Sequence, residues 1–210
     1  MGERVSLCFL LTAGQGTRLR PYTDKTAKPL IPIVQTPLVY FGFYLAKQAG
    51  FKNFLLNKHH LPEQIDSLAL NLKPFCESIQ VSDETEKLLG SGGAIWKART
   101  ILSKHDFFMI VNGDEVMIPK DPKILSHLFA HFKKTDSLCT LLTTDHEELM
   151  KTLKPVWTLD GEVKGFGMDS PDSNCHPVHY TGYKVFSKKI FDWLSEGESN
   201  IFYEVLVKAI

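Results

Sequence analysis

A glycine-rich loop directly follows the first apolar segment of the chain. Gly14 and Gly16 come after the run Val5–Thr12, whose near-continuous apolar character predicts a strand buried on both faces. Basic residues follow the glycines, among them Arg18, Arg20 and Lys28. Glycines let backbone N–H groups approach an anion closely, and the cations supply charge that neutralises phosphates. The glycines alone also fit an ordinary strand-to-helix turn, and the cations alone fit a solvated surface.

The order of residues in this loop separates it from two other phosphate-binding loops. Leu19 stands where a dinucleotide-binding fingerprint needs its third glycine, and no Gly-Lys-Ser/Thr of a Walker A loop follows. Arg20 and Lys28 each precede a proline, which predicts an extended backbone at both cations. We expect Arg18 and Lys28 to face solvent and to hold a triphosphate.

Asn112-Gly113-Asp114 is the second candidate for chemistry. It ends the apolar segment Asp106–Asn112, another predicted buried strand. Mg²⁺ usually binds one or two carboxylates together with phosphate oxygens, so Asp114 is a candidate metal ligand. A type I turn built from Asn, Gly and Asp explains the same residues without any metal. Glu115 is either a further ligand or a solvated neighbour.

A run of small residues, Leu89–Ala94, is the third candidate. Small side chains allow a flat ligand such as a nucleobase to lie against the backbone. The alternative is a helix N-terminal loop in which Ser91 is the cap.

The elements that must position these residues alternate between strand and helix. Apolar runs predict strands at Asn53–Asn57, Ser78–Ser82, Ser137–Thr143 and near His179–Phe186, with a hairpin around Asp160-Gly161. Helices are expected at Thr36–Gly50 with Thr36 as N-cap, and at Pro62–Leu72, Gly93–Leu102, Pro122–Lys134, Lys188–Leu194 and Phe202–Ala209. This alternation predicts an α/β fold with a mostly parallel central sheet flanked by helices. Ligands bind at the carboxyl ends of such strands, which places Gly14, Gly16 and Asp114 on one rim.

Length and composition set the class of protein. The 210 residues fit a single domain, and Lys+Arg and Asp+Glu both total 24, so a nucleic-acid partner is not expected. The four cysteines have no metal-ligand spacing, which favours reduced thiols and a cytoplasmic location. No segment suggests a membrane span or signal peptide. The histidines are scattered, and His59-His60 is expected in a surface loop.

Taken together, these residues resemble the sugar-phosphate nucleotidyltransferases, also called nucleotide-sugar pyrophosphorylases. The segment Leu11–Pro21 followed by Lys28-Pro-Leu-Ile-Pro32 is similar to the family signature LAAGxGTRLRP…KPLxP. The similarity continues through Pro37-Leu38 and Leu89–Ala94 to Val111-Asn-Gly-Asp114, in the family's order. Within the family, the chain is similar to N-acetylmuramate 1-phosphate uridylyltransferases and to mannose or heptose 1-phosphate guanylyltransferases.

The resemblance implies a Rossmann-like fold and a set of site residues. Residues 1–115 would form the nucleotide-binding half of one domain and residues 116–210 a strand-rich sugar-phosphate half. Arg18, Lys28 and Asp114 would be catalytic, with Asp114 holding Mg²⁺. Contacts to the nucleotide are expected from Leu11, Ala13, Gly14, Gly16, Thr17, Arg18, Lys28, Gly92 and Asn112, and contacts to the sugar from Thr181 and Gly182. The substrates would be a nucleoside triphosphate and a sugar 1-phosphate; the sequence does not indicate an oligomeric state.

This sequence departs from the family pattern in two places. Gly165–Pro171 stands where many members have Phe-x-Glu-Lys-Pro, whose Glu and Lys meet the sugar phosphate. The Trp-x-Asp-x-Gly segment that supplies another metal-binding Asp in the family does not occur before Ile210. The departures keep open a second hypothesis, a non-catalytic nucleotide- or sugar-binding relative acting as a regulatory subunit. A nicotinamide-dependent oxidoreductase is disfavoured, because the third glycine and an acidic residue about 20 residues further on are missing.

Overall fold

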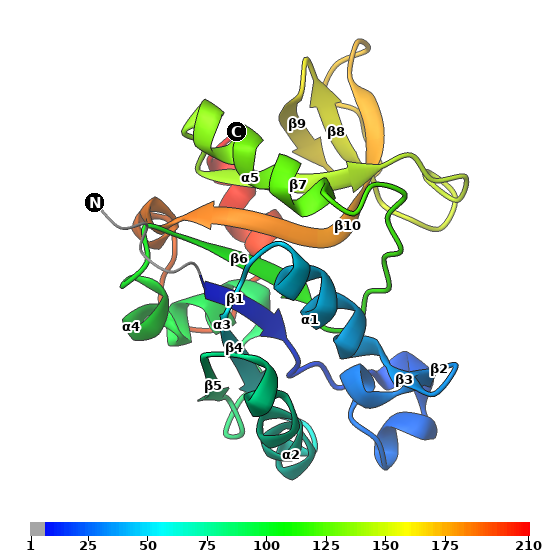
Figure 1. Cartoon of the computed structure of the whole chain (residues 1–210). Helices are drawn as coiled ribbons and strands as arrows, with labels where there is room; N and C mark the ends of the chain where they lie inside the picture. The colour runs from blue at the N-terminus through cyan, green and yellow to red at the C-terminus, as the bar shows by residue number, and fades with distance from the viewer. Residues whose placement is uncertain (1–6) are drawn as a thin grey trace.

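The computed structural model describes residues 7–210, which form a mixed sheet with helices on both faces (Figure 1). The sheet has the order β5-β4-β1-β6-β10-β8-β9, and β7 pairs with β10. Its strands are β1 Leu7–Leu11, β4 Asn53–Lys58, β5 Ser78–Asp83, β6 Phe107–Asn112, β7 Cys139–Thr144, β8 Val156–Leu159, β9 Glu162–Phe166 and β10 His176–Ser187. A separate ribbon consists of β2 Pro32–Ile33 and β3 Thr36–Pro37. Val5 and Ser6 of the first predicted strand lie outside the described residues.

The half of the sheet that contains β1, β4, β5 and β6 is parallel, as the apolar runs predicted. β1 pairs in parallel with β4 and β6, and β4 pairs in parallel with β5. Along β1, Leu7 and Phe9 pack into one hydrophobic cluster and Cys8 and Leu10 into the other, all at most 1% exposed. A strand that is buried on both faces needs apolar side chains at successive positions, which explains the continuous run.

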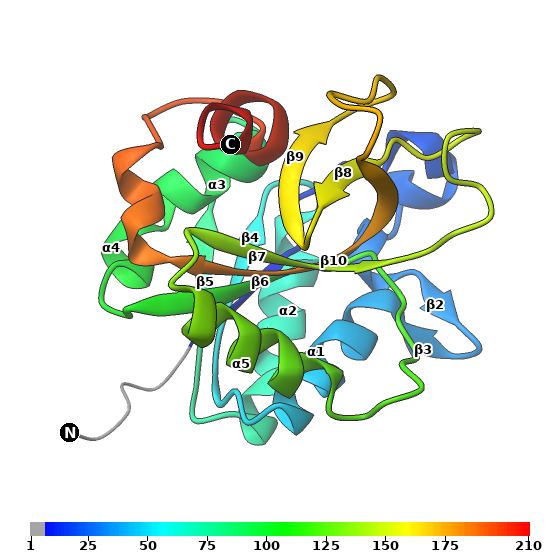
Figure 2. The same ribbon diagram turned by 90° about the horizontal axis from the view of Figure 1, so that it is seen from above.

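Helices cover the two faces separately (Figure 2). α1 Leu38–Gln48, α2 Pro62–Leu72 and α5 Ile124–Thr135 pack on one face. α3 Gly90–Lys97, α4 Arg99–Leu102 and the C-terminal 3₁₀ and π turns pack on the other. The bounds of α2 agree with the prediction. The prediction of Thr36 as an N-cap is wrong, because Thr36 pairs with Ile33 in the β2–β3 ribbon and α1 begins two residues later.

The second half of the sheet is antiparallel and centres on β10, which runs antiparallel to β6, β7 and β8. The pairing of β10 with β7 shifts register between Tyr180 and Lys184. Tyr183 lies opposite Val111 of β6, so the irregular part of β10 is adjacent to the carboxyl end of β6. The strand therefore brings Thr181 and Gly182 close to the segment that carries Asp114.

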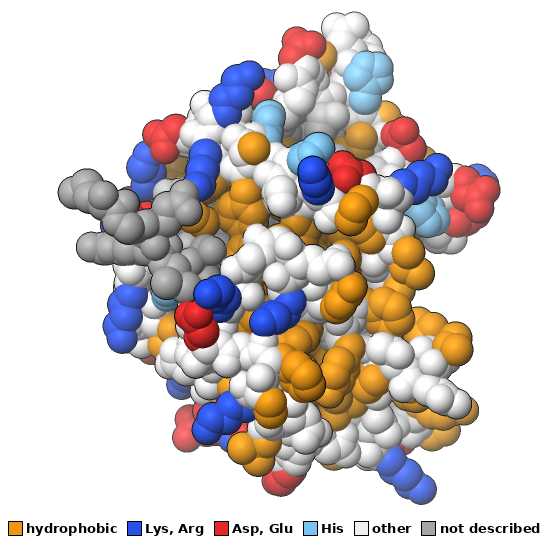
Figure 3. All heavy atoms as spheres, in the orientation of Figure 1, with side chains coloured by type: hydrophobic (Ala, Val, Ile, Leu, Met, Phe, Trp, Pro, Cys, Tyr) orange, Lys and Arg blue, Asp and Glu red, His pale blue; other side chains and the backbone are white. Residues whose placement is uncertain are grey.

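Hydrophobic side chains gather on the surface around α1 (Figure 3). They line a groove between α1 and the segment after β6, and include Tyr40, Tyr44, Phe75, Met117 and Ile118. Within residues 7–210, every helix is too short or too polar to cross a lipid bilayer.

Candidate nucleotide-binding site

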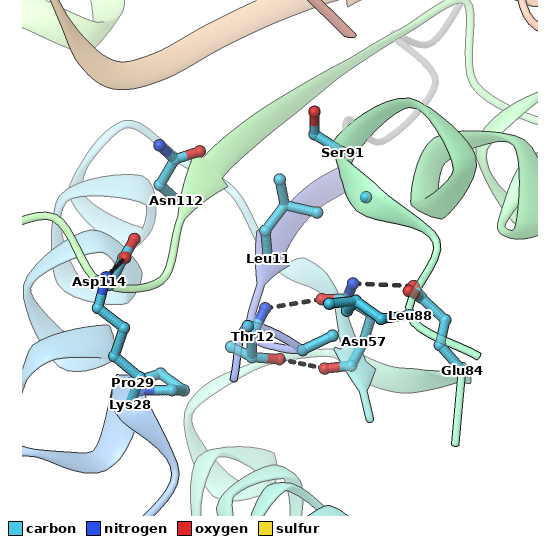
Figure 4. Close-up of a pocket in the computed structure, with 13 residues that line it drawn as sticks. Leu11, Thr12, Lys28, Pro29, Asn57, Glu84, Leu88, Ser91, Asn112 and Asp114 are labelled. Carbon is cyan, nitrogen blue, oxygen red and sulfur yellow. Dashed lines mark hydrogen bonds and ion pairs between the residues drawn. The ribbon is translucent and has the colours of Figure 1, made fainter. Parts of the chain in front are cut away.

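Two adjoining cavities open at the carboxyl ends of β1, β4 and β6. The first, the strand-end cavity, has a volume of about 240 Å³ (Figure 4) and is lined by Leu11, Thr12, Ala13, Gly14, Lys28, Pro29, Asn57, Glu84, Leu88, Gly90, Ser91, Asn112 and Asp114. The second, the loop cavity, has a volume of about 410 Å³ and is lined by Gly14, Gly16, Thr17, Arg18, Leu19, Lys28 and Asp114. Because Gly14, Lys28 and Asp114 line both, the two cavities form one cleft. Most of the predicted site residues meet in it.

The two glycines of the loop have different structural roles. Gly16 has a φ of 63°, and a Cβ there would lie 2.7 Å from Cγ2 of Thr23, so both conformation and space require glycine. The Thr23 hydroxyl donates a hydrogen bond to the Gly16 carbonyl at 2.9 Å, which closes the turn. A Cβ at Gly14 would meet no atom within 4 Å, since this residue borders the open cleft.

The cations of the loop agree only in part with the prediction. Arg18 is exposed and Arg20 is extended, with a ψ of 142°. Lys28 is not extended, because it begins a 3₁₀ turn in which the Leu30 N–H donates to the Ala27 carbonyl at 2.8 Å. Nor does Lys28 face solvent freely. Its side chain is 22% exposed, and its ammonium forms an ion pair with the Asp114 carboxylate.

The Lys28–Asp114 ion pair joins the loop to the end of β6 across 86 residues of sequence. The Asp114 side chain is 31% exposed, so one side of its carboxylate remains accessible from the cleft. Among residues 7–210, no cluster of three or more His, Cys, Asp or Glu side chains has metal-binding geometry. The donor set here is one accessible carboxylate, which fits Mg²⁺ when phosphate oxygens and waters complete its coordination.

Glu115 is half-buried rather than solvated. Burial, and secondarily the neighbouring Asp114 carboxylate, raises the pKa of Glu115. Its side chain packs against Gly182, where a Cβ would lie 2.4 Å from Cγ of Glu115. Thr181 donates its hydroxyl to the Leu142 carbonyl at 2.9 Å. Thr181 and Gly182 thus lie beside the Asp114–Glu115 segment but line neither cavity, and their contact with a sugar remains a prediction.

Gly92 lies behind the cleft rather than on its wall. Its N–H donates to the Ser199 carbonyl at 2.8 Å, and a Cβ at Gly92 would lie 2.5 Å from Oγ of Ser199. Gly90 and Ser91 line the strand-end cavity in its place. Ser91 is not the helix cap either, because Leu89 precedes the first helical residue and the Ser91 hydroxyl accepts from the Ile201 N–H at 3.0 Å. The sequence could not show this, since the glycines contact a segment about a hundred residues away.

Among the residues of the strand-end cavity that sequence reasoning missed, two carry polar side chains and lie outside every predicted motif. Asn57, which ends the predicted strand Asn53–Asn57, and Glu84 are both only 3% exposed, and their side chains are hydrogen-bonded at 2.8 Å. Burial is the main cause that raises the pKa of Glu84. His59 and His60 lie in the loop between β4 and α2, as expected, but both rings are only partly exposed and bond to backbone carbonyls. The sequence did offer one indication of these residues, because Asn57 and His59 lie at the end of a predicted strand and therefore on the predicted ligand-binding rim.

A buried lysine lies on β10 beyond the cleft. Lys184 is 1% exposed, and its ammonium donates to the Tyr180 hydroxyl at 2.7 Å. Burial lowers the pKa of Lys184 to about 8. The free energy of unfolding therefore depends on pH through this residue.

A glycine loop, basic side chains and an accessible carboxylate at the carboxyl edge of a parallel sheet are typical of α/β proteins that bind phosphate ligands. The chain belongs to the nucleotidyl transferase family, whose profile matches residues 8–151. The predicted resemblance is thereby confirmed.

Curated relatives agree with this membership, and a solved structure agrees with the fold. A UTP–glucose-1-phosphate uridylyltransferase of Synechocystis is 30% identical over 203 residues, which is 90% of this chain and 51% of the relative. An N-acetylmuramate alpha-1-phosphate uridylyltransferase of Neisseria meningitidis serogroup B is 28% identical over 196 residues, 90% of this chain and 78% of the relative. The inositol-1-phosphate CTP transferase of T. maritima superimposes with a TM-score of 0.77 at 20% identity, covering 99% of this chain and 82% of that one, and confirms the predicted fold. The chain spans about half the length of the first relative.

Proposed function

We propose that the protein transfers a nucleotidyl group from a nucleoside triphosphate to a sugar 1-phosphate, giving a nucleotide sugar and pyrophosphate. The observation that carries the proposal is the single cleft in which the glycine loop, Arg18, Lys28 and Asp114 meet. The named activities of the two uridylyltransferase relatives support the same reaction class. No feature of the cleft favours the regulatory alternative.

The geometry suggests a division of the cleft between parts of the nucleotide. The strand-end cavity, with Leu11, Ala13 and Gly90 on its wall, suits a base and ribose. The loop cavity, with Gly16, Thr17 and Arg18, suits the phosphates. An oxygen of the sugar phosphate would attack the α-phosphorus in line, and pyrophosphate would leave with the electrons of the broken P–O bond. Such a reaction needs positioning and charge neutralisation rather than a nucleophilic side chain.

Lys28 and Asp114 stand where the two cavities join. Lys28 would exchange its ion pair with Asp114 for contacts to the phosphates, and Asp114 would then hold Mg²⁺. When bound, Mg²⁺ neutralises charge on the phosphate oxygens and brings the two phosphates together. We further propose a cytoplasmic location for the reaction, supported by the free thiols of Cys8, Cys76, Cys139 and Cys175.

The test is a panel of nucleoside triphosphates and sugar 1-phosphates with Mg²⁺, with release of pyrophosphate as the readout. A nucleotide sugar should form with at least one combination and should be absent without Mg²⁺. Tight triphosphate binding without pyrophosphate release from any combination would instead support the regulatory alternative.

A further inference from the structure

The carboxyl end of β4 connects to both neighbouring loops through one side chain (Figure 4). Asn57 Oδ1 accepts a hydrogen bond from the Thr12 N–H at 2.6 Å, and Asn57 Nδ2 donates to Oε1 of Glu84 at 2.8 Å. The Thr12 hydroxyl donates back to the Asn57 carbonyl at 2.5 Å. Asn57 thus ties the first residue after β1 to the segment after β5, and both segments line the strand-end cavity.

The same strand end reaches the loop cavity by a separate route. His60 Nε2 donates to the Thr23 carbonyl at 2.6 Å. The Thr23 hydroxyl in turn donates to the Gly16 carbonyl at 2.9 Å, and Gly16 lines the loop cavity. The Thr23 methyl carbon also lies 2.7 Å from the position that a Cβ of Gly16 would take, so Thr23 packs closely against the turn. His60 therefore acts on the phosphate side of the cleft and Asn57 on the other side.

We propose that Asn57 and His60 are positioning residues that set the two halves of the nucleotide site independently. Asn57 fixes the walls that take the base and ribose, and His60 fixes the turn that takes the phosphates beyond the first. This inference rests on the proposed function for the identity of the ligand. Its chemical basis is the burial and hydrogen bonding of the two side chains, which need not touch the nucleotide themselves.

The burial of Glu84 explains why loss of the Asn57 side chain should deform the strand-end cavity. Oε2 of Glu84 is buried and has no hydrogen-bond partner within residues 7–210, so Asn57 supplies the side-chain donor to this carboxylate. A buried carboxylate that loses such a donor raises the free energy of the folded state, because its lost contacts with water are no longer replaced. The segment from Glu84 to Gly90 is then expected to shift until the carboxylate reaches water, and this shift deforms the strand-end cavity.

The hydrogen bond between Asn57 and Glu84 can be broken by one substitution and restored by a second, with donor and acceptor exchanged. Asn57→Asp keeps an acceptor for the Thr12 N–H but places a second carboxylate against Glu84. Adding Glu84→Gln turns that partner into a donor and restores both hydrogen bonds. On the other side, His60→Leu removes the donor to the Thr23 carbonyl, and His60→Gln retains an N–H donor.

Affinities are measured by calorimetry for matched pairs of nucleoside monophosphates and triphosphates carrying uracil, guanine, cytosine, adenine and thymine. For the base that binds, Asn57→Asp should weaken monophosphate and triphosphate equally, by roughly tenfold or more. Asn57→Asp combined with Glu84→Gln should recover most of that loss. His60→Leu should weaken the triphosphate by roughly tenfold and leave the monophosphate within about twofold, with partial recovery in His60→Gln.

A matched control comes from the other end of the same two strands. The Ser78 hydroxyl donates to Oδ1 of Asn53 at 2.5 Å, which joins β4 to β5 far from the cleft. Ser78→Ala should lower thermal stability without changing any nucleotide affinity. Equal losses for both ligands in His60→Leu, or no recovery in the Asn57/Glu84 double variant, would overturn the inference while leaving the proposed function intact. A wild-type protein that binds none of the nucleotides would overturn both.

Discussion

Replacing Lys28 tests how much of the triphosphate affinity depends on this lysine. Lys28→Met keeps the length of the side chain and removes the ammonium that pairs with Asp114. A charge-assisted hydrogen bond to a phosphate contributes about 1.5–3 kcal/mol. In the free protein the same ammonium already pairs with Asp114, and separating a pair that is 22% and 31% exposed costs about 0.5–1 kcal/mol. The net loss of triphosphate affinity is then about 1–2 kcal/mol, or roughly 5- to 30-fold.

The same change has a smaller expected effect on stability. Loss of the ion pair should lower the free energy of unfolding by about 0.5–1 kcal/mol, which corresponds to a fall in Tm of roughly 1–4 °C for a domain of this size. Calorimetry gives the affinities for triphosphate and monophosphate, and differential scanning fluorimetry gives the Tm.

Lys25→Met is the matched control for Lys28→Met. Lys25 lies three residues earlier, is exposed and lines neither cavity, so its loss removes the same formal charge outside the site. Its effect on triphosphate affinity should be less than about twofold, since exposed charges are screened by salt. If Lys28→Met binds triphosphate as tightly as the wild type, or no more weakly than Lys25→Met, the assignment of Lys28 to the phosphates is wrong.

Three further perturbations follow from the structure. Asp114→Asn should lower pyrophosphate release by orders of magnitude and change triphosphate affinity less, because the carboxylate is needed for the metal-dependent step; full activity in this variant would contradict the metal role. Gly92→Ala should lower Tm clearly, since its Cβ would meet Ser199 at 2.5 Å, whereas Gly14→Ala should be close to neutral in thermal melts because no atom lies within 4 Å. Lys184→Met should raise the free energy of unfolding at pH 7 by on the order of 1–3 kcal/mol, because folding of the variant no longer moves a charged ammonium from water into the interior. That gain should shrink above pH 8, where folded Lys184 loses its proton before the unfolded chain does; a gain that stays constant to pH 10 in denaturant titrations would refute the lowered pKa.

The sequence determined the parallel half of the fold because its signals are local. Continuous apolar runs at β1, β4 and β6 are required by strands covered on both faces, and α2 has both a proline at its start and an amphipathic pattern. The order of these elements alone placed the glycine loop and Asp114 on one rim. The predicted residues Leu11, Ala13 and Asn112 accordingly line the strand-end cavity.

The tertiary structure decided the features that depend on contacts between distant segments. The sequence suggested that Gly92 and Gly93 leave space for a ligand. In the structure that space is taken by residues 197–199, and no local sequence pattern predicts this contact. Lys28 is not a free cation because Asp114, 86 residues later, neutralises it. Asn57 and His60 belong to no predicted motif, and their hydrogen-bond partners lie in loops distant in sequence. Periodicity encodes which face of an element is buried, whereas the partner of a buried polar group depends on how the sheet brings distant chain segments together.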